Sequence, residues 1–136
     1  VMALLRQHGI DIIYTDCDGN VNHLIPLWLD VGLNCMFPLE VRAGNDIAAL
    51  RRRYGRELRF IGGFDKFALL EGREAILQEL RRLEPIAQDG GFIPHVDHRC
   101  PDGVPYEHYV TYIREKCAFL GMSETEIANI PALRRQ

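Results

Sequence analysis

The chain has 136 residues, of which 47% are hydrophobic and 26% charged, a composition typical of a globular domain with its own core. Its net charge of −3 gives no electrostatic reason to expect nucleic acid or an anionic membrane as a partner. No apolar run approaches the roughly 20 residues of a membrane span, and the first residues show no signal-peptide cleavage pattern. We therefore expect one cytoplasmic domain over residues 1–136, with neither nucleic acid nor membrane as a partner.

The cysteines support the same compartment. Cys17, Cys35, Cys100 and Cys117 lie far apart and form no Cys-x-x-Cys pair, which argues against a zinc ribbon or a disulfide framework. We expect four free thiols, as in a reducing cytoplasm.

A glycine followed by a short apolar run occurs four times, beginning at Gly9, Gly32, Gly55 and Gly90. Each glycine follows a stretch with helical periodicity, and glycine readily adopts the left-handed conformation that ends a helix. The repeated order is therefore helix, glycine, strand and polar loop.

The expected elements alternate along the chain. Strands are predicted at 11–14, 34–37, 59–62 and within 90–98, and helices at 21–31, 45–54, 72–88 and 105–121. A capping box from Ser123 to Glu126 predicts a short last helix. Arg51, Arg52 and Arg53 are expected on a solvated helix face.

This alternation favours βαβ units and a parallel sheet, so the predicted fold class is α/β. The short strands are apolar at successive positions, which is typical of a sheet covered on both faces. His23 and His108 fall within predicted helices, where a structural or solvated role is expected.

Chemically capable side chains gather where the predicted strands end, and these are Asp16, Asp18, Glu40, Asp65, Lys66, His95, Asp97, His98 and Arg99. In parallel α/β folds the site lies at the carboxyl ends of the strands. The opposite, helix-to-strand turns carry mostly glycine and ordinary surface charge. This asymmetry predicts an active site at the carboxyl ends.

Structural alternatives exist for several of these residues. Asp16 and Asp18 could cap the following loop and helix, Glu40 could be a surface residue, and Asp65 could cap a helix. The run "HVDHR", residues 95–99, is harder to explain structurally, because two histidines, an acid and an arginine occupy five positions.

The stretch "GGFIPHVDHRCPDGVPYEHY" resembles the C-terminal signature of the uroporphyrinogen decarboxylase superfamily. In that family the last barrel strand ends on a histidine or cysteine, followed by two prolines and a glutamate-containing helix. The matching residues here are His98, Pro101, Pro105 and Glu107. The runs "IIYTDCDGN", "NCMFPLEV" and "FIGGFDK" are similar to the family's strands five, six and seven, in the same order.

The resemblance implies a TIM-type (β/α)8 barrel, of which this chain would be the C-terminal half, strands five to eight. Four strands cannot close a barrel, and they leave an open edge and an uncovered inner face. We expect a fragment that lacks the N-terminal half-barrel, with association of two copies as the alternative.

The resemblance also implies a metal site. One branch of the superfamily moves methyl groups between corrinoid carriers and thiols, and binds zinc through His-x-Cys after strand five and Cys after strand eight. Those positions correspond here to Asp16, Asp18 and His98, and Glu40 could complete the set. This oxygen-rich set still suits zinc, and also manganese or iron.

Three functions follow as hypotheses. The first is metal-assisted methyl transfer of the corrinoid and thiol type, with a corrinoid protein as partner. Asp65, Lys66 and Arg99 would bind an anionic small-molecule substrate, and His95, Asp97 or His98 would act as acid or base. The second is a metal-free, cofactor-free decarboxylase of porphyrin biosynthesis, in which His98 and Arg99 contact substrate carboxylates. The third is a non-catalytic half-barrel that pairs with a partner chain.

Overall fold

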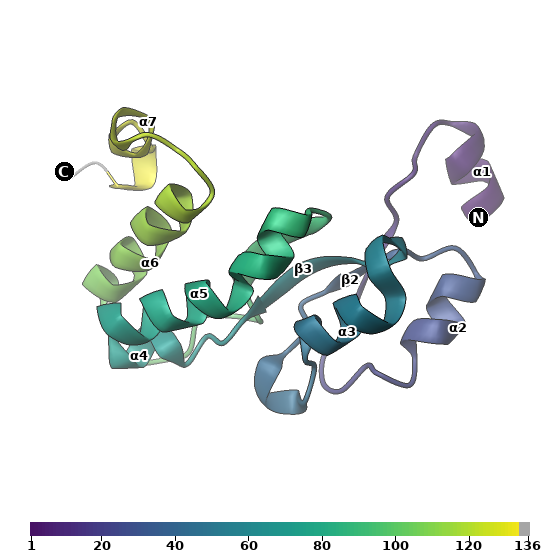
Figure 1. The fold of residues 1–136 in the computed structure, drawn as a ribbon, viewed down its shortest axis with the longest axis horizontal. Coiled ribbons are helices and arrows are strands. Elements are labelled where there is room, and N and C mark those ends of the chain that lie inside the picture. The colour runs from purple at the N-terminus through teal and green to yellow at the C-terminus, as the bar shows by residue number, and fades with distance from the viewer. Residues whose placement is uncertain (134–136) are drawn as a thin grey trace.

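The computed structural model describes residues 1–133 (Figure 1). Its strands are β1 (Tyr14–Asp16), β2 (Cys35–Phe37), β3 (Arg59–Phe64) and β4 (Phe92–Val96). Its α-helices are α1 (Met2–Gln7), α2 (Ile25–Asp30), α3 (Ile47–Tyr54), α4 (Ala68–Glu71), α5 (Arg73–Asp89), α6 (Tyr106–Phe119) and α7 (Glu124–Ala128). Short 3-10 turns, η1 (Val41–Ala43), η2 (Gly55–Glu57) and η3 (Pro131–Leu133), complete the described part.

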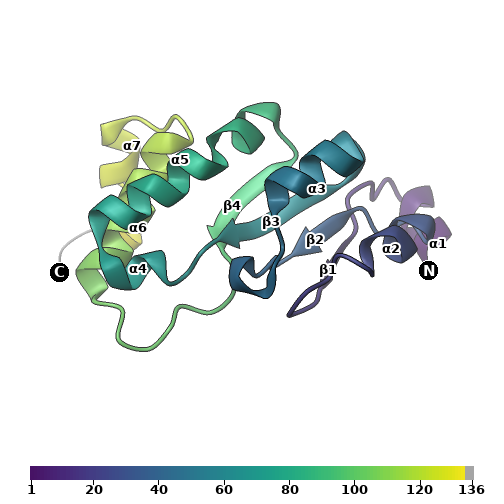
Figure 2. The ribbon, with the colours of Figure 1, turned by 60° about the horizontal axis from the view of Figure 1, so that its bottom comes forward.

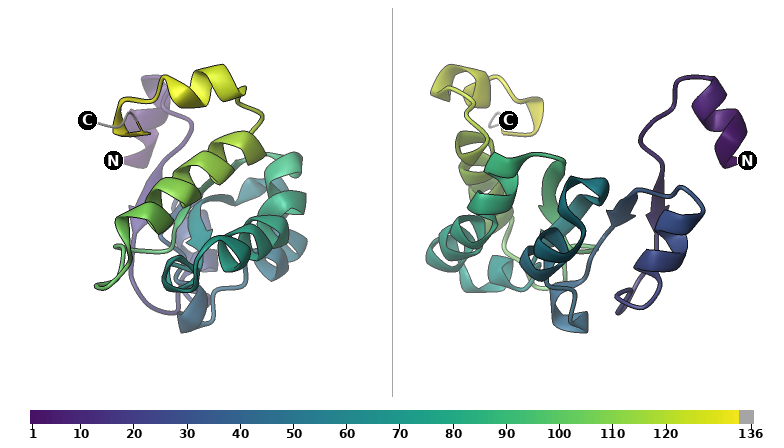
Figure 3. Two further views of the ribbon diagram at one scale, coloured as in Figure 1. Left: turned by 90° about the vertical axis from the view of Figure 1, so that its left-hand side faces the viewer. Right: turned by 45° about the vertical axis from the view of Figure 1, so that its right-hand side comes forward.

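The four strands form one parallel sheet in the order β1-β2-β3-β4. Each connection therefore moves one strand along in the same direction, and right-handed crossovers then place the intervening helices on the same face. Figure 2 shows α3 and α5 over that face, and α6 lies beside α5 (Figure 3). The predicted α/β class and parallel sheet are confirmed, and the arrangement is consistent with half of a barrel.

A single large core lies between the sheet and these helices. Met36, Phe60 and Phe64 from the strands are at most 1% exposed, and they join Ile25, Ile47, Leu80 and Tyr112 from the helices in one cluster. The Phe64 and Tyr112 rings lie 4.6 Å apart. A smaller cluster joins α6 to α7 through Cys117 and Ile127.

The opposite face of the sheet is open at both of its edges. Tyr14 on β1 is 59% exposed and Ile93 on β4 is 60% exposed. The expectation of a sheet covered on both faces is therefore wrong. The apolar residues on both faces had suggested two helix layers, but every crossover helix here packs into the core of one face.

Local signals in the sequence were largely reliable. The four glycines that follow helical stretches, Gly9, Gly32, Gly55 and Gly90, all have positive φ. Ser123 and Glu126 form the expected capping box, and Asp46 caps α3 by accepting from the backbone N–H groups of Ala48 and Ala49. All four cysteines are free thiols.

Two details differ from expectation. Helix α2 begins at Ile25, four residues later than predicted, because residues 22–24 form a turn. Arg51 does not lie on a solvated face: its side chain is 12% exposed and donates to the carbonyls of Gly55 and Gly90. The guanidinium also lies 4.8 Å from the Phe60 ring centroid, so α3 is fastened to the amino-terminal end of the sheet. None of the helices within residues 1–133 is both long and apolar enough to cross a membrane.

Candidate functional site

The carboxyl ends of β2 and β3 are held together by backbone contact. The Gly63 N–H donates to the Pro38 carbonyl at 3.0 Å. A Cβ on Gly62 would lie 1.8 Å from the same carbonyl oxygen, and Gly62 has a φ of 112°. Only glycine fits at this position, which explains the Gly-Gly pair in "FIGGFDK" and fixes where the following Asp65 and Lys66 emerge.

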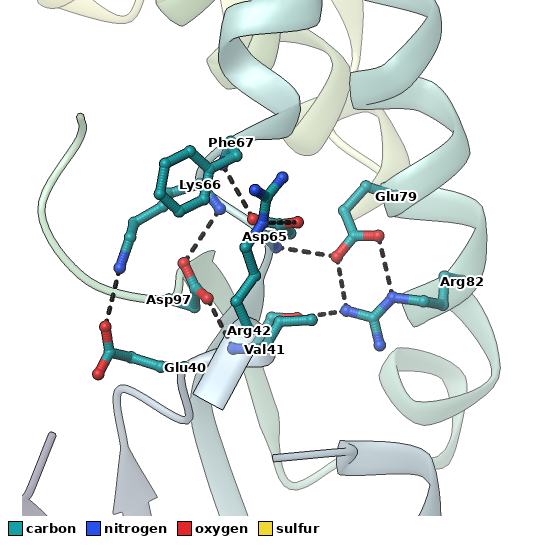
Figure 4. Close-up of polar contacts among 10 residues, drawn as sticks. Glu40, Val41, Arg42, Asp65, Lys66, Phe67, Glu79, Arg82 and Asp97 are labelled. Carbon is teal, nitrogen blue, oxygen red and sulfur yellow. Dashed lines mark hydrogen bonds and ion pairs between the residues drawn. The ribbon is translucent and has the colours of Figure 1, made fainter. Parts of the chain in front are cut away.

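Asp97 connects the loops that follow three strands. Its side chain is 1% exposed and lies directly after β4. One carboxylate oxygen accepts from the Val41 N–H at 2.7 Å, and the other accepts from the Lys66 N–H at 3.0 Å (Figure 4). Burial raises the pKa of Asp97, and the two backbone donors partly oppose that rise. With both oxygens occupied and no solvent access, Asp97 holds the loops in place.

Glu40 and Lys66 form an ion pair between the loops after β2 and β3, which are the loops that Asp97 contacts. The Lys66 ammonium lies 2.9 Å from Glu40, and the second Glu40 oxygen accepts from the Gly19 N–H at 2.8 Å. Hydrogen bonds from Lys66 and from Gly19 lower the pKa of Glu40. Because the side chains are 13% and 22% exposed, the pair is largely shielded from water. Glu40 therefore ties the loop after β1 to the loop after β3.

Helix α5 supports the loop after β3 from behind. Glu79 accepts from the Asp65 N–H at 2.8 Å and from Arg82, while Arg82 also donates to the Gly63 carbonyl at 2.6 Å (Figure 4). Asp65 in turn accepts from Arg42, whose guanidinium lies over the Phe67 ring at 4.0 Å. Asp65 also accepts from the Phe67 N–H in the turn before α4, but Phe67 is the N-cap of α4 and no side chain within residues 1–133 caps this helix, so the helix-capping alternative for Asp65 is not borne out. A cavity of about 330 Å³ on this helix side is lined in part by Asp65, Glu79 and Arg82.

Asp18 and His98 meet across the carboxyl edge of the sheet. The His98 Nε2 lies 3.4 Å from an Asp18 carboxylate oxygen. These residues come from the loops after β1 and β4, which are the first and last strands of the sheet. The side chains are 65% and 34% exposed for Asp18 and His98, so the pair remains open to a ligand.

Asp16 and His95 lie at the two edges of the open face, and both are exposed. The His95 Nδ1 is 2.7 Å from the Val96 carbonyl, and its ring lies 6.0 Å from the Phe37 ring. Strands two positions apart are separated by about 9.6 Å, so the two rings lean toward each other over the glycines of β3. His95 thus presents an imidazole beside an aromatic ring on the open face.

The four residues predicted as metal ligands are only partly gathered. Asp18 and His98 are in contact, whereas Glu40 is occupied by Lys66 and Gly19. The Asp16 side chain is exposed and makes no hydrogen bond or ion pair within residues 1–133. Within residues 1–133, no three His, Cys, Asp or Glu side chains form a ready metal-binding group. The Asp18–His98 pair suits a metal as two ligands, and Glu40 as it stands does not.

The remaining predicted residues have distinct environments. Arg99 is exposed in the loop after β4 and is available to an anion. His108 is held by the Leu69 carbonyl at 2.7 Å, in line with its expected structural role, and His23 is exposed on the way into α2.

Three residues that organise the site were not predicted: Arg42, Glu79 and Arg82. Glu79 and Arg82 are one helical turn apart on α5, which resembles an ordinary surface ion pair in the sequence. No local feature of the sequence reveals that both side chains reach the backbone of residues 63–65.

Comparisons with known proteins add no assignment, because no family model, no curated protein and no solved structure matches the chain. The arrangement of residues at the carboxyl edge therefore carries the functional argument. It offers a carboxylate–imidazole pair, an exposed imidazole, a shielded lysine and an exposed arginine.

Proposed function

We propose that the chain is the C-terminal half of a TIM-type barrel enzyme of the uroporphyrinogen decarboxylase superfamily, working in the cytoplasm. The single observation that carries the proposal is the contact between Asp18 and His98 at 3.4 Å. By the resemblance to the superfamily, these residues correspond to the zinc ligands of its methyltransferase branch. They follow β1 and β4, the two outer strands of the sheet. We favour metal-assisted methyl transfer between a corrinoid carrier and a thiol.

In this proposal Asp18, His98 and the exposed Asp16 would hold zinc. A zinc ion with an open coordination position would supply a Lewis acid for the acceptor. Glu40 keeps Lys66 in place and is not a ligand, since both of its oxygens are engaged. This departs from the ligand set expected from the sequence.

The protein's own groups would bind and orient the substrate. The exposed Arg99 supplies positive charge for an anionic small molecule, and Asp65 positions Arg42 at the rim. Lys66, expected to bind substrate, is instead neutralised by Glu40. The exposed His95 imidazole is suited to proton transfer, because histidine is the side chain most often used as a general acid or base. Asp97 would not contact the substrate. It would position the loops after β2 and β3, whose Val41 and Lys66 N–H groups it binds.

The runner-up is a metal-free decarboxylase, in which His98 and Arg99 contact substrate carboxylates. The observation in its favour is that only two of the four expected ligands lie in contact. A non-catalytic half-barrel is the third candidate.

One set of assays separates the three functions. The protein is incubated with methylcobalamin and a thiol, and in parallel with uroporphyrinogen, and methyl transfer and carbon dioxide release are both measured. Transfer that is lost in Asp18→Ala and His98→Ala and kept in Asp11→Ala supports the proposal. Release of carbon dioxide without metal would favour the decarboxylase, and absence of both activities in the assembled barrel would favour the non-catalytic role.

A further inference from the structure

Within residues 1–133 the sheet has two unpaired edges, and its open face carries exposed apolar side chains at both of them. β1 and β4 each have a single hydrogen-bonded neighbour. Ile12, Tyr14 and Ile93, which flank these edges, are 58%, 59% and 60% exposed. Open edges and exposed apolar residues of this kind promote association with another chain.

The two edges match each other in chemistry. On the β1 side, apolar Ile12 and Tyr14 precede the acids Asp16 and Asp18. On the β4 side, apolar Ile93 precedes His95, with His98 and Arg99 in the loop beyond. If the two edges met with their strands parallel, apolar side chains would face apolar ones, and acids would meet imidazole and guanidinium groups at the carboxyl rim.

We infer that a second copy of this chain covers the open face, related by a two-fold axis that runs along the axis of the closed barrel. This rotation keeps all strands parallel and sets β4 of each copy against β1 of the other. Four strands from each copy then give the eight of a closed barrel, which has no free edge. The inference rests on the half-barrel fold proposed above.

The register inside one copy predicts which residues meet. Asp16 pairs with Phe37, and Ile61 pairs with Ile93. Extending the Met36–Phe60 pair by one residue places Phe37 beside Ile61. Asp16 on β1 and Ile93 on β4 therefore lie in the same row of paired residues across the sheet.

In a closed barrel of this type, the hydrogen-bond register shifts along the strands by about eight residues over one full circuit of the barrel. Each copy therefore contributes a shift of about four residues. Ile93 of one copy therefore lies beside Ile12 of the other, and His95 lies beside Tyr14. A shift in the opposite direction would place Ile93 against Asn20, which lies in a loop and donates to the Ala43 carbonyl. The two exposed isoleucines are the pair that the closure brings together.

The closure also changes the candidate site. His95 of the second copy would stand at the β1 edge, near Asp16 and the Asp18–His98 pair. Each carboxyl-edge site would then contain an imidazole from the other copy, and the site of a single chain would be incomplete.

The first test is the mass of the full chain in solution, measured by light scattering after size-exclusion chromatography. We expect twice the 15.6 kDa of one chain. Ile93→Asp and Ile12→Asp should each shift the folded protein to the monomer, because a charge would be buried in the interface. The matched control Leu70→Asp, on α4 at the helical side, should remain dimeric. A folded wild-type monomer, a larger open assembly, or a dimer that survives Ile93→Asp would overturn the inference.

The second test addresses the register. In a background with Cys17→Ser and Cys100→Ser, Ile12→Cys and Ile93→Cys are combined. Neighbouring strands bring Cα atoms within the roughly 4.4–6.8 Å that a disulfide spans, so oxidation should give a covalent dimer. The control pair Leu70→Cys with Ile93→Cys should stay monomeric on a non-reducing gel. Cross-linking in the control and not in the test pair would contradict the register.

These tests are separate from the activity assays. A monomer would overturn the two-copy closure and leave the proposed enzyme dependent on an N-terminal half-barrel. Conversely, a dimer without methyl transfer would remove the proposed reaction and keep the closure.

Discussion

Asp97 and Glu40 are acids in the same cluster, yet their surroundings shift their pKa values in opposite directions. Asp97 is buried and its carboxylate receives only backbone donors, so loss of water raises its pKa. Glu40 is paired with the Lys66 ammonium, and this contact lowers its pKa. Stability should therefore depend on pH differently for each residue.

For Asp97 the folded-state pKa lies above the ordinary value of 3.8. Its contribution to stability is then full below that value and is lost as pH rises through the folded-state pKa. Relative to Asp97→Asn, the free energy of unfolding of the wild type should fall as pH rises from 3.8 toward neutral. Urea unfolding of both proteins across this range measures the difference, and a gap that grows with pH would contradict the prediction.

For Glu40 the sign is reversed, because its folded-state pKa lies below the ordinary value of 4.5. Its stabilising contribution is present above 4.5 and is lost as pH falls through the folded-state pKa. The advantage of the wild type over Glu40→Gln should therefore shrink on acidification. The same urea series provides the measurement, and an advantage that is unchanged below pH 4.5 would argue against the ion pair.

At the scale of elements, α5 determines where the loop after β3 lies. Glu79 is 13% exposed and accepts from the Asp65 backbone and from Arg82, so its removal leaves the half-buried Asp65 N–H and the Arg82 guanidinium without this partner. We expect Glu79→Ala to lower the free energy of unfolding by about 2 kcal/mol.

The matched control for Glu79 lies on the same helix. Glu74 is 84% exposed and lies 3.8 Å from Arg81, so Glu74→Ala should have almost no effect. Thermal or urea unfolding of both variants tests the comparison. Equal effects would mean that Glu79 acts only as a surface residue.

The contact between β2 and β3 gives a second prediction at this scale. Gly62→Ala places a Cβ against the Pro38 carbonyl at a positive φ, and should cost about 3 kcal/mol or more. Gly121 has a φ of 86° and open space around its Cα, so Gly121→Ala should cost about 1 kcal/mol. Denaturation curves that show similar losses for both variants would rule out the close approach.

Sequence reasoning succeeded where the signal was local. Glycines at helix ends, the capping box at Ser123 and the parallel order of the strands follow from short-range chemistry. It failed where distant residues meet: Arg51 reaches a carbonyl 39 residues away, and Glu79 reaches a backbone amide 14 residues away. No periodicity encodes such contacts.

The candidate site shows the same division. The predicted side chains do gather at one edge of the sheet, because parallel strands end together. The separate roles of its acids depend on burial and partners that only the folded chain defines. Asp97 lies in the same short run as His95 and His98, but it is the one that burial removes from the surface.

At the scale of the whole molecule, the first and last loops of the sheet meet at Asp18 and His98, although α1 and α7 lie at opposite ends of the molecule (Figure 1). This meeting carries the proposed function. The most direct test is elemental analysis of the folded protein, purified without chelators, beside Asp18→Ala and the control Asp11→Ala. We predict about one metal ion per chain in the wild type and in Asp11→Ala, and loss of it in Asp18→Ala. A wild-type protein that is metal-free, or an Asp18→Ala variant that keeps its metal, would contradict the account.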